Sequence, residues 1–212
     1  DLINFVDEIY STFGFTYRME LSTKPEKAMG DPKLWDLAEK TLKEVLDATK
    51  KEYLLNEGDG AFYGPKIDFH LTDSIGRTWQ CGTIQLDMQM PEKFNLTYEG
   101  PNNEKKRPVM IHRAIIGSVE RFLGILVEHF EGKFPLWISP VQVAILPVSD
   151  RHNEYALSLE KQLKEKGFRV ETDTNALTMN KKIRNAQLQK INYILVVGDK
   201  EQENKTVNIR TR

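Results

Sequence analysis

The chain has little cysteine, little net charge and no long apolar run. Its single cysteine, Cys81, excludes an internal disulfide and is typical of a reducing compartment, so we expect a cytoplasmic protein. Because no stretch of about 18 apolar residues occurs, we expect no membrane-spanning helix. The 212 residues are 40% hydrophobic, which is enough to bury a sizeable core in one large or two modest domains.

The net charge of −1 hides an uneven distribution. Residues 140–212 hold 13 Lys and Arg against 9 Asp and Glu, a balance of +4, whereas residues 1–139 hold 17 against 22. The basic C-terminal part allows a polyanionic partner without requiring one.

Residues 1–139 mix helical and strand patterns. Apolar residues recur at helical spacing over residues 1–13 and again from Pro32, where Asp31 is placed to cap the helix. Residues 15–21 alternate like a strand. Residues 66–87 alternate on both sides of a turn at 73–76, so we predict an antiparallel hairpin there.

The second strand of this hairpin has a parity problem. In a regular strand Gln80 would lie on one face, and Thr83 with Gln85 on the other. Glycine within a strand often marks a bulge, and one extra residue near Gly82 would bring all three polar side chains to one face. We therefore predict a β-bulge at Cys81 and Gly82.

The pattern changes after residues 134–140, where two prolines suggest a linker. Strands and helices alternate from there, and the first strand is nearly continuously apolar, as in a parallel sheet buried on both faces. The expected elements are strands at 141–148, 168–172, 193–198 and 206–210 and helices at 153–166 and 180–190. The predicted fold class is thus α+β followed by a mainly parallel or mixed α/β unit.

Arg121 occupies an unusual place in an expected helix. An apolar strand at 108–116 runs through Gly117 into this helix, so Arg121 lies in its first turn, where a cation opposes the helix dipole. An anion would be favoured there, which indicates a phosphate site formed by Arg121 and backbone N–H groups of residues 118–120. An exposed arginine beside Glu120 explains the pattern equally well.

His112 is the polar residue of the same apolar strand. Spacing alone favours a structural histidine, because neither Cys81 nor His70 lies at a ligand-like distance from it in the sequence. Cys81 is most simply a small core residue, and His70, at the end of an alternating strand, is expected at the surface. His129 and His152 have no informative context.

Two further groups of residues have open interpretations. Tyr63 and Lys66 flank Gly64-Pro65 and could face a substrate, or Lys66 could be an exposed lysine after an ordinary turn. Lys181, Lys182 and Arg184 are typical of a phosphate-contacting cluster, but a solvated helix face explains them equally well.

At this point the motifs carry a family resemblance. The stretch from Gly117 to Phe122 resembles motif 3 of the class II aminoacyl-tRNA synthetases, a strand followed by a helix whose arginine binds ATP. Three more specific blocks, Gly60–Asp68, Trp79–Asp87 and Arg107–Ser118, resemble the threonyl-tRNA synthetase family. The resemblance covers essentially the whole chain.

The resemblance implies a fold and an activity. Residues 1–136 are expected to be the C-terminal portion of an antiparallel class II catalytic domain, with motif 3 at about 108–131. Residues 137–212 are expected to be an anticodon-binding domain that lacks its last helix. The implied activity is ATP-dependent activation of threonine and its transfer to tRNA(Thr), by an enzyme that is a homodimer when complete.

The resemblance also implies residue roles. Arg121 is expected to contact the ATP phosphates, with Mg2+ bound to ATP. The adenylate and amino-acid pocket is expected to include Tyr63, Lys66, Gln80, Thr83, Gln85 and Ser118. His112 is expected to be one of three protein ligands of a Zn2+ ion that binds the amino group and hydroxyl of threonine. Arg184, Glu201 and Arg210 are expected to read anticodon bases.

Other parts of the family pattern are missing from the sequence. We find no motif 1, no motif 2 with its arginine, and neither of the other two zinc ligands, so we expect a fragment that holds zinc weakly and is inactive alone. The alternative is a non-catalytic module that resembles a synthetase and binds tRNA or ATP.

Overall fold

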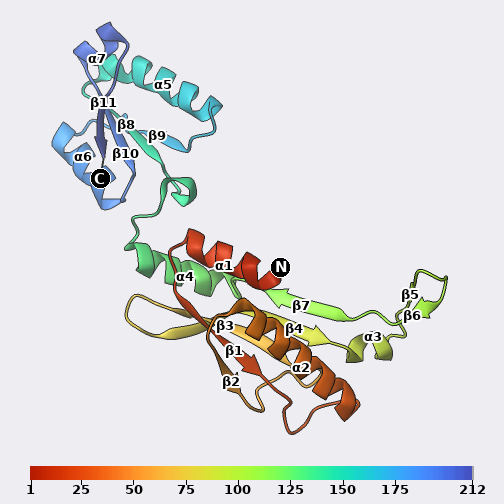
Figure 1. Ribbon diagram of the computed structural model, residues 1–212. Helices are drawn as coiled ribbons and strands as arrows, with labels where there is room; N and C mark the ends of the chain where they lie inside the picture. The colour runs from red at the N-terminus through yellow and green to blue at the C-terminus, as the bar shows by residue number, and fades with distance from the viewer. Residues whose placement is uncertain (212) are drawn as a thin grey trace. The chain divides into compact units, whose positions relative to one another are not determined.

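A five-stranded sheet forms the centre of the first of two units. The computed structural model describes residues 1–211 and divides into Asp1–Ile125 and a second unit that begins at Leu126 (Figure 1). The sheet has the order β2-β1-β3-β4-β7, in which β1 and β2 are parallel and all other neighbours are antiparallel. Its strands are β1 (Tyr17–Ser22), β2 (Tyr53–Asn56), β3 (Lys66–Thr72), β4 (Thr78–Asp87) and β7 (Met110–Ala114).

Helices α1 (Leu2–Thr12), α2 (Pro32–Thr49) and α4 (Val119–Phe130) pack on the apolar face of this sheet. Tyr10 of α1 contacts Gly82 of β4, and Trp35 of α2 and Leu86 of β4 line one small cavity. The Asp31 side chain accepts a hydrogen bond from the Lys33 N–H and caps α2, as predicted.

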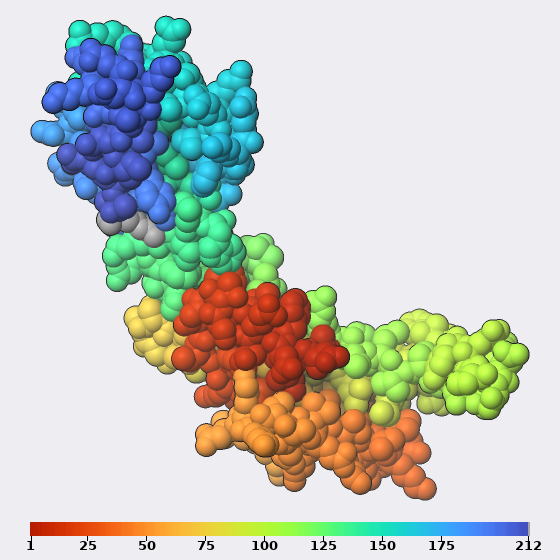
Figure 2. Space-filling model, turned by 45° about the horizontal axis from the view of Figure 1, so that its top comes forward, coloured from red at the N-terminus to blue at the C-terminus, as the bar shows by residue number. Residues whose placement is uncertain are grey.

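The first unit also contains elements that the sequence did not predict. These are the edge strand β2, the short helix α3 (Gln89–Lys93), and the two-stranded hairpin of β5 (Tyr98–Glu99) and β6 (Lys105–Lys106). The hairpin projects from the rest of this unit (Figure 2). All are short or irregular segments, which periodicity detects poorly.

The predicted hairpin and its bulge are confirmed. Gly82 pairs with Phe69 and Gln80 pairs with His70, so Cys81 is the extra residue of β4. Gln80, Thr83 and Gln85 consequently lie on one face, while Ile84 and Leu86 face the helices. Cys81 is 4% exposed and belongs to the core, as expected.

The second unit is a four-stranded sheet of order β11-β10-β8-β9. The strands β8 (Val143–Pro147), β9 (Val170–Thr172) and β10 (Tyr193–Val197) are parallel, and β11 (Asn208–Thr211) is antiparallel. Helix α5 (Asn153–Glu165) covers one face, and α6 (Met179–Leu188) covers the other. A further short helix, α7 (Asp199–Asn204), precedes β11. The predicted fold class, α+β followed by a mixed α/β unit, is confirmed.

Candidate functional site

The face of the first sheet opposite the helices carries a row of polar side chains. Cross-strand pairing places Ser22 beside Lys66, and Asp68 beside Thr83. Asp68 is 1% exposed and accepts hydrogen bonds from Ser22 Oγ, Gln80 Nε2 and Thr83 Oγ1 at 2.9, 2.6 and 2.8 Å. The structure thus joins two predicted site residues, Gln80 and Thr83, through a carboxylate that was not singled out from the sequence.

Lys66 belongs to the same group. Its Nζ lies 2.8 Å from Asp68 Oδ2 and 3.2 Å from Asp59 Oδ2, and only 12% of its side chain is exposed. Burial lowers the pKa of Lys66, but the hydrogen bonds and charges of Asp68 and Asp59 outweigh burial, so the pKa is raised. Lys66 is therefore a permanent cation on this face, and the alternative of an exposed turn lysine is wrong.

A second group lies at the end of β4. The carboxylate of Asp87 is fully buried, accepts hydrogen bonds from the N–H groups of Gln89 and Met90, and contacts His112 Nε2 at 2.8 Å. The rings of Tyr63 and His112 meet edge to face at 5.6 Å, and the Tyr63 hydroxyl donates to Gln85 Oε1. Burial and the Asp87 charge raise the pKa of Tyr63, so this hydroxyl stays a donor.

Gln85 connects the two groups, because it is the neighbour of Lys66 on β3 and of His112 on β7. The structure therefore brings six predicted site residues to one face. They are Tyr63, Lys66, Gln80, Thr83, Gln85 and His112.

Arg121 lies in the first turn of α4, as predicted. Its guanidinium lies over the Trp79 ring at 5.6 Å, and Trp79 directly precedes Gln80. Ser118 Oγ accepts the Arg121 N–H and donates to Glu120. Hydrogen bonds from the Glu120 N–H and from Ser118 lower the pKa of Glu120, so its carboxylate already neutralises part of the helix N-terminus.

The three predicted anticodon residues lie on separate elements of the second unit. Arg184 on α6 and Arg210 on β11 are exposed. Glu201 accepts the Gly198 N–H and so caps α7. No ion pair joins these three residues within the described range 1–211.

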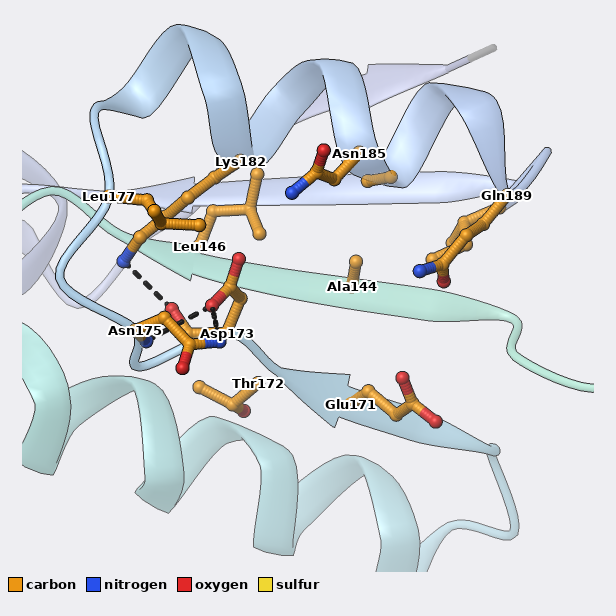
Figure 3. Close-up of a pocket in the computed structure, with 12 residues that line it drawn as sticks. Ala144, Leu146, Glu171, Thr172, Asp173, Asn175, Leu177, Lys182, Asn185 and Gln189 are labelled. Carbon is orange, nitrogen blue, oxygen red and sulfur yellow. Dashed lines mark hydrogen bonds between the residues drawn. The ribbon is translucent and has the colours of Figure 1, made fainter.

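Lys182 does not behave as either interpretation of its cluster predicted. It is 5% exposed, and its Nζ donates to the carbonyl oxygens of Pro147 and Asp173 at 3.1 and 2.8 Å. It lines a cavity of about 260 Å³ between α6, β8 and β9, toward which Asn185 and Gln189 also extend (Figure 3). Lys182 therefore secures the loop after β9, whereas Lys181 and Arg184 remain exposed.

Several charged or titratable residues were missed or misplaced in the sequence-based predictions. His70 was expected at the surface, but its side chain is only 17% exposed and contacts the buried Glu20 at 3.3 Å. His152 is 2% exposed and bonds Ser149 and Asp199. Asp68 and Asp87 were not singled out, although polar residues at every second position of residues 66–70 already indicated a polar strand face.

Within residues 1–211 no cluster of three or more His, Cys, Asp or Glu side chains could hold a metal ion. Over the same residues, no helix has the length and apolar character needed to cross a membrane.

Comparison with known families identifies the class of protein. Residues 1–130 match the tRNA synthetase class II core domain (G, H, P, S and T), and residues 142–212 match the anticodon binding domain. The chain therefore belongs to the class II aminoacyl-tRNA synthetases.

Relatives narrow the resemblance to the threonine enzymes. The chain is 59% identical over 211 residues to the threonine–tRNA ligase of Desulforamulus reducens and 58% identical to that of Acetivibrio thermocellus. Each match covers 100% of this chain and 33% of the relative, so the chain spans about a third of their length. The RNA binding domain of threonyl-tRNA synthetase from Cryptosporidium parvum Iowa II matches with a TM-score of 0.96 and 48% identity, over 99% of this chain and 53% of that one. The resemblance to threonyl-tRNA synthetases is confirmed.

Proposed function

We propose that this chain is part of a threonine–tRNA ligase that activates threonine with ATP and transfers it to tRNA(Thr). Residues 1–136 are its share of the catalytic domain, and residues 137–212 are its anticodon-binding domain. The carrying observation is the gathering of six family site residues on one sheet face, in a chain 59% identical to a threonine–tRNA ligase.

The first unit supplies positioning and charge for activation. Lys66 and Arg121 are cations suited to the phosphates of ATP with its Mg2+, and Ser118 lies beside Arg121. Gln80, Thr83 and Gln85 present amide and hydroxyl groups that can orient the nucleotide and the amino acid, with the Tyr63 hydroxyl bound to Gln85.

His112 fits the role of a zinc ligand. Asp87 accepts a proton from Nε2, which leaves the lone pair of the neutral ring on Nδ1, and 42% of the side chain is exposed. A bound Zn2+ would accept the amino group and hydroxyl of threonine and so reject valine. The other two protein ligands would come from the catalytic domain upstream of this chain.

The second unit is the proposed tRNA-binding part. Arg184 and Arg210 are exposed cations that can contact an RNA backbone or base, and Glu201 lies at the start of α7. Membership of the class II family further supports a cytoplasmic homodimer in the complete enzyme.

ATP–pyrophosphate exchange tests the activity. The assay would use this chain and a chimera in which the chain replaces the matching third of the Desulforamulus reducens relative, each with threonine and with valine. We expect threonine-dependent exchange by the chimera alone. Exchange by neither protein would refute the proposal and favour the alternative, a non-catalytic module that binds tRNA or ATP.

The roles of Arg121 and His112 need separate measurements. Arg121→Ala in the chimera should lower exchange strongly while the thermal unfolding midpoint stays within a few degrees, and unchanged kinetics would count against a phosphate role. The isolated chain should lose zinc on dialysis, because it offers one expected ligand of three. Stoichiometric zinc after dialysis would contradict this ligand assignment.

A further inference from the structure

Asp68 makes more contacts with site residues than any function assigned above explains. Its two carboxylate oxygens accept from four side chains on three neighbouring strands. Oδ2 accepts from Ser22 Oγ at 2.9 Å and Lys66 Nζ at 2.8 Å, and Oδ1 accepts from Gln80 Nε2 at 2.6 Å and Thr83 Oγ1 at 2.8 Å. Three of these four donors are proposed substrate-binding residues.

We propose that Asp68 is the positioning residue of the site, which fixes Lys66, Gln80 and Thr83 in their substrate-binding orientations through its two carboxylate oxygens. This inference rests on the proposed function, because it assigns a role within that same site. Asp68 is itself 1% exposed and its oxygens are engaged by four donors, so it is not placed to touch a substrate or to exchange protons with one.

The bulge makes the shared contact possible. Gln80 and Thr83 are three residues apart, and in a regular strand they would lie on opposite faces. With Cys81 as the extra residue, both reach Oδ1 of Asp68, and Gln80 Nε2 also lies 3.2 Å from Thr83 Oγ1. The irregularity of β4 and the position of Asp68 on β3 therefore form one arrangement.

The contacts determine which atoms remain for a ligand. Because the Gln80 amide nitrogen is held by Asp68, its oxygen is the group that can accept a hydrogen bond from a bound molecule. Lys66 keeps its charge between two carboxylates, since Asp59 also lies within 3.2 Å. Asp68 thus presents an acceptor at Gln80 and a cation at Lys66.

Stability alone does not explain a buried carboxylate here. Removing a charge from water carries a desolvation penalty, and replacing a buried ion pair by well-packed apolar residues is often neutral or stabilising. A charged acceptor, in contrast, holds donors in short and directional bonds, and preorganised polar groups are what transition-state stabilisation requires.

The test compares Asp68→Asn and Asp68→Glu with the matched control Asp47→Asn, which removes an exposed carboxylate from α2 that binds Tyr53. In the chain itself, NMR would follow the side-chain amide of Gln80 and the ammonium of Lys66. We expect Asp68→Asn to shift both signals and to speed solvent exchange of the Lys66 ammonium at least about tenfold, and Asp47→Asn to leave both unchanged.

Kinetics in the chimera provide the second readout. Asp68→Asn should lower kcat/KM for ATP in the exchange reaction at least about tenfold per folded molecule, with partial recovery in Asp68→Glu. A merely structural role would lower the unfolding midpoint but leave kcat and KM of the folded fraction unchanged, and that result would overturn the inference.

Failure of the proposed function can be told apart from failure of the inference. If the unsubstituted chimera shows no exchange, the proposed function fails and the NMR signals decide the role of Asp68. Loss of the Lys66 and Gln80 restraints in folded Asp68→Asn or Asp68→Glu would then support positioning, and unchanged signals would overturn it.

Discussion

Gly117 lies directly against the backbone of Cys81. A Cβ atom at Gly117 would come within 3.0 Å of the Cys81 carbonyl oxygen, and the φ angle of Gly117 is +63°, in the left-handed region. Helix α4 begins two residues later, at Val119. The contact therefore fixes where Arg121 starts its helix relative to the bulge of β4.

Gly117→Ala should destabilise the chain by at least about 1 kcal/mol, because the new methyl group meets backbone and the positive φ is strained for alanine. Chemical denaturation would measure this. Gly124→Ala is the matched control within α4, since a methyl group there would meet no atom within 4 Å and alanine favours helix. Equal effects of the two substitutions would contradict the prediction.

Tyr10→Phe should cost about 1–3 kcal/mol of unfolding free energy, because it leaves a carbonyl without its donor. Tyr10 is fully buried, and its hydroxyl donates to the Ile115 carbonyl between β7 and α4. Tyr53→Phe, which removes an exposed hydrogen bond to Asp47, should cost much less. Urea denaturation of both variants would decide, and a larger loss for Tyr53→Phe would refute the assignment.

Lys182→Met should destabilise the second unit by about 1–3 kcal/mol. The substitution retains the apolar stem but leaves the carbonyls of Pro147 and Asp173 without the ammonium donor. Lys181→Met, at the exposed neighbouring position, should have little effect on stability. Hydrogen exchange of the α6 amides would show the difference, and equal protection in both variants would contradict it.

The turn after β3 should resist acid. Burial raises the pKa of Asp73, but hydrogen bonds from Trp79, from the Arg77 side chain and from backbone N–H groups outweigh it and hold the pKa well below 3.8. A lowered folded pKa contributes stability that is present above the ordinary value and is lost as pH falls through the folded value. The Trp79 indole N–H signal should therefore stay constant from neutral pH to about pH 4.

The control for the Asp73 prediction is Asp73→Asn, in which no carboxylate remains to titrate. Its Trp79 signal should differ from that of the parent at neutral pH and should show no acid transition of its own. A midpoint at or above about pH 4 in the parent chain would show that the Asp73 pKa is not lowered.

Features that depend on neighbouring residues were predictable from the sequence. The cap at Asp31, the 66–87 hairpin and the bulge at Cys81 follow from residues a few positions apart, and each is confirmed. The family resemblance supplied the site residues, and sheet pairing brings six of them together.

Features that depend on distant partners were not predictable in this way. Asp68 meets Ser22 across 46 residues, Asp87 meets His112 across 25, and Lys182 meets Pro147 across 35. Nothing local distinguishes these carboxylates and this ammonium from exposed ones. His70 and His152 escaped for the same reason, since their partners Glu20 and Asp199 lie on other elements.

The extra residue of β4 gives this strand the equivalent of a reading frame. Deleting Cys81 would straighten the ladder, but everything on one side of the deletion would exchange faces. With the register before the deletion kept, Thr83 and Gln85 would turn toward the helices, while Ile84 and Leu86 would turn away from the core. A single-residue deletion here would thus disable chemistry and packing together, although each substitution within the strand would affect only one of them.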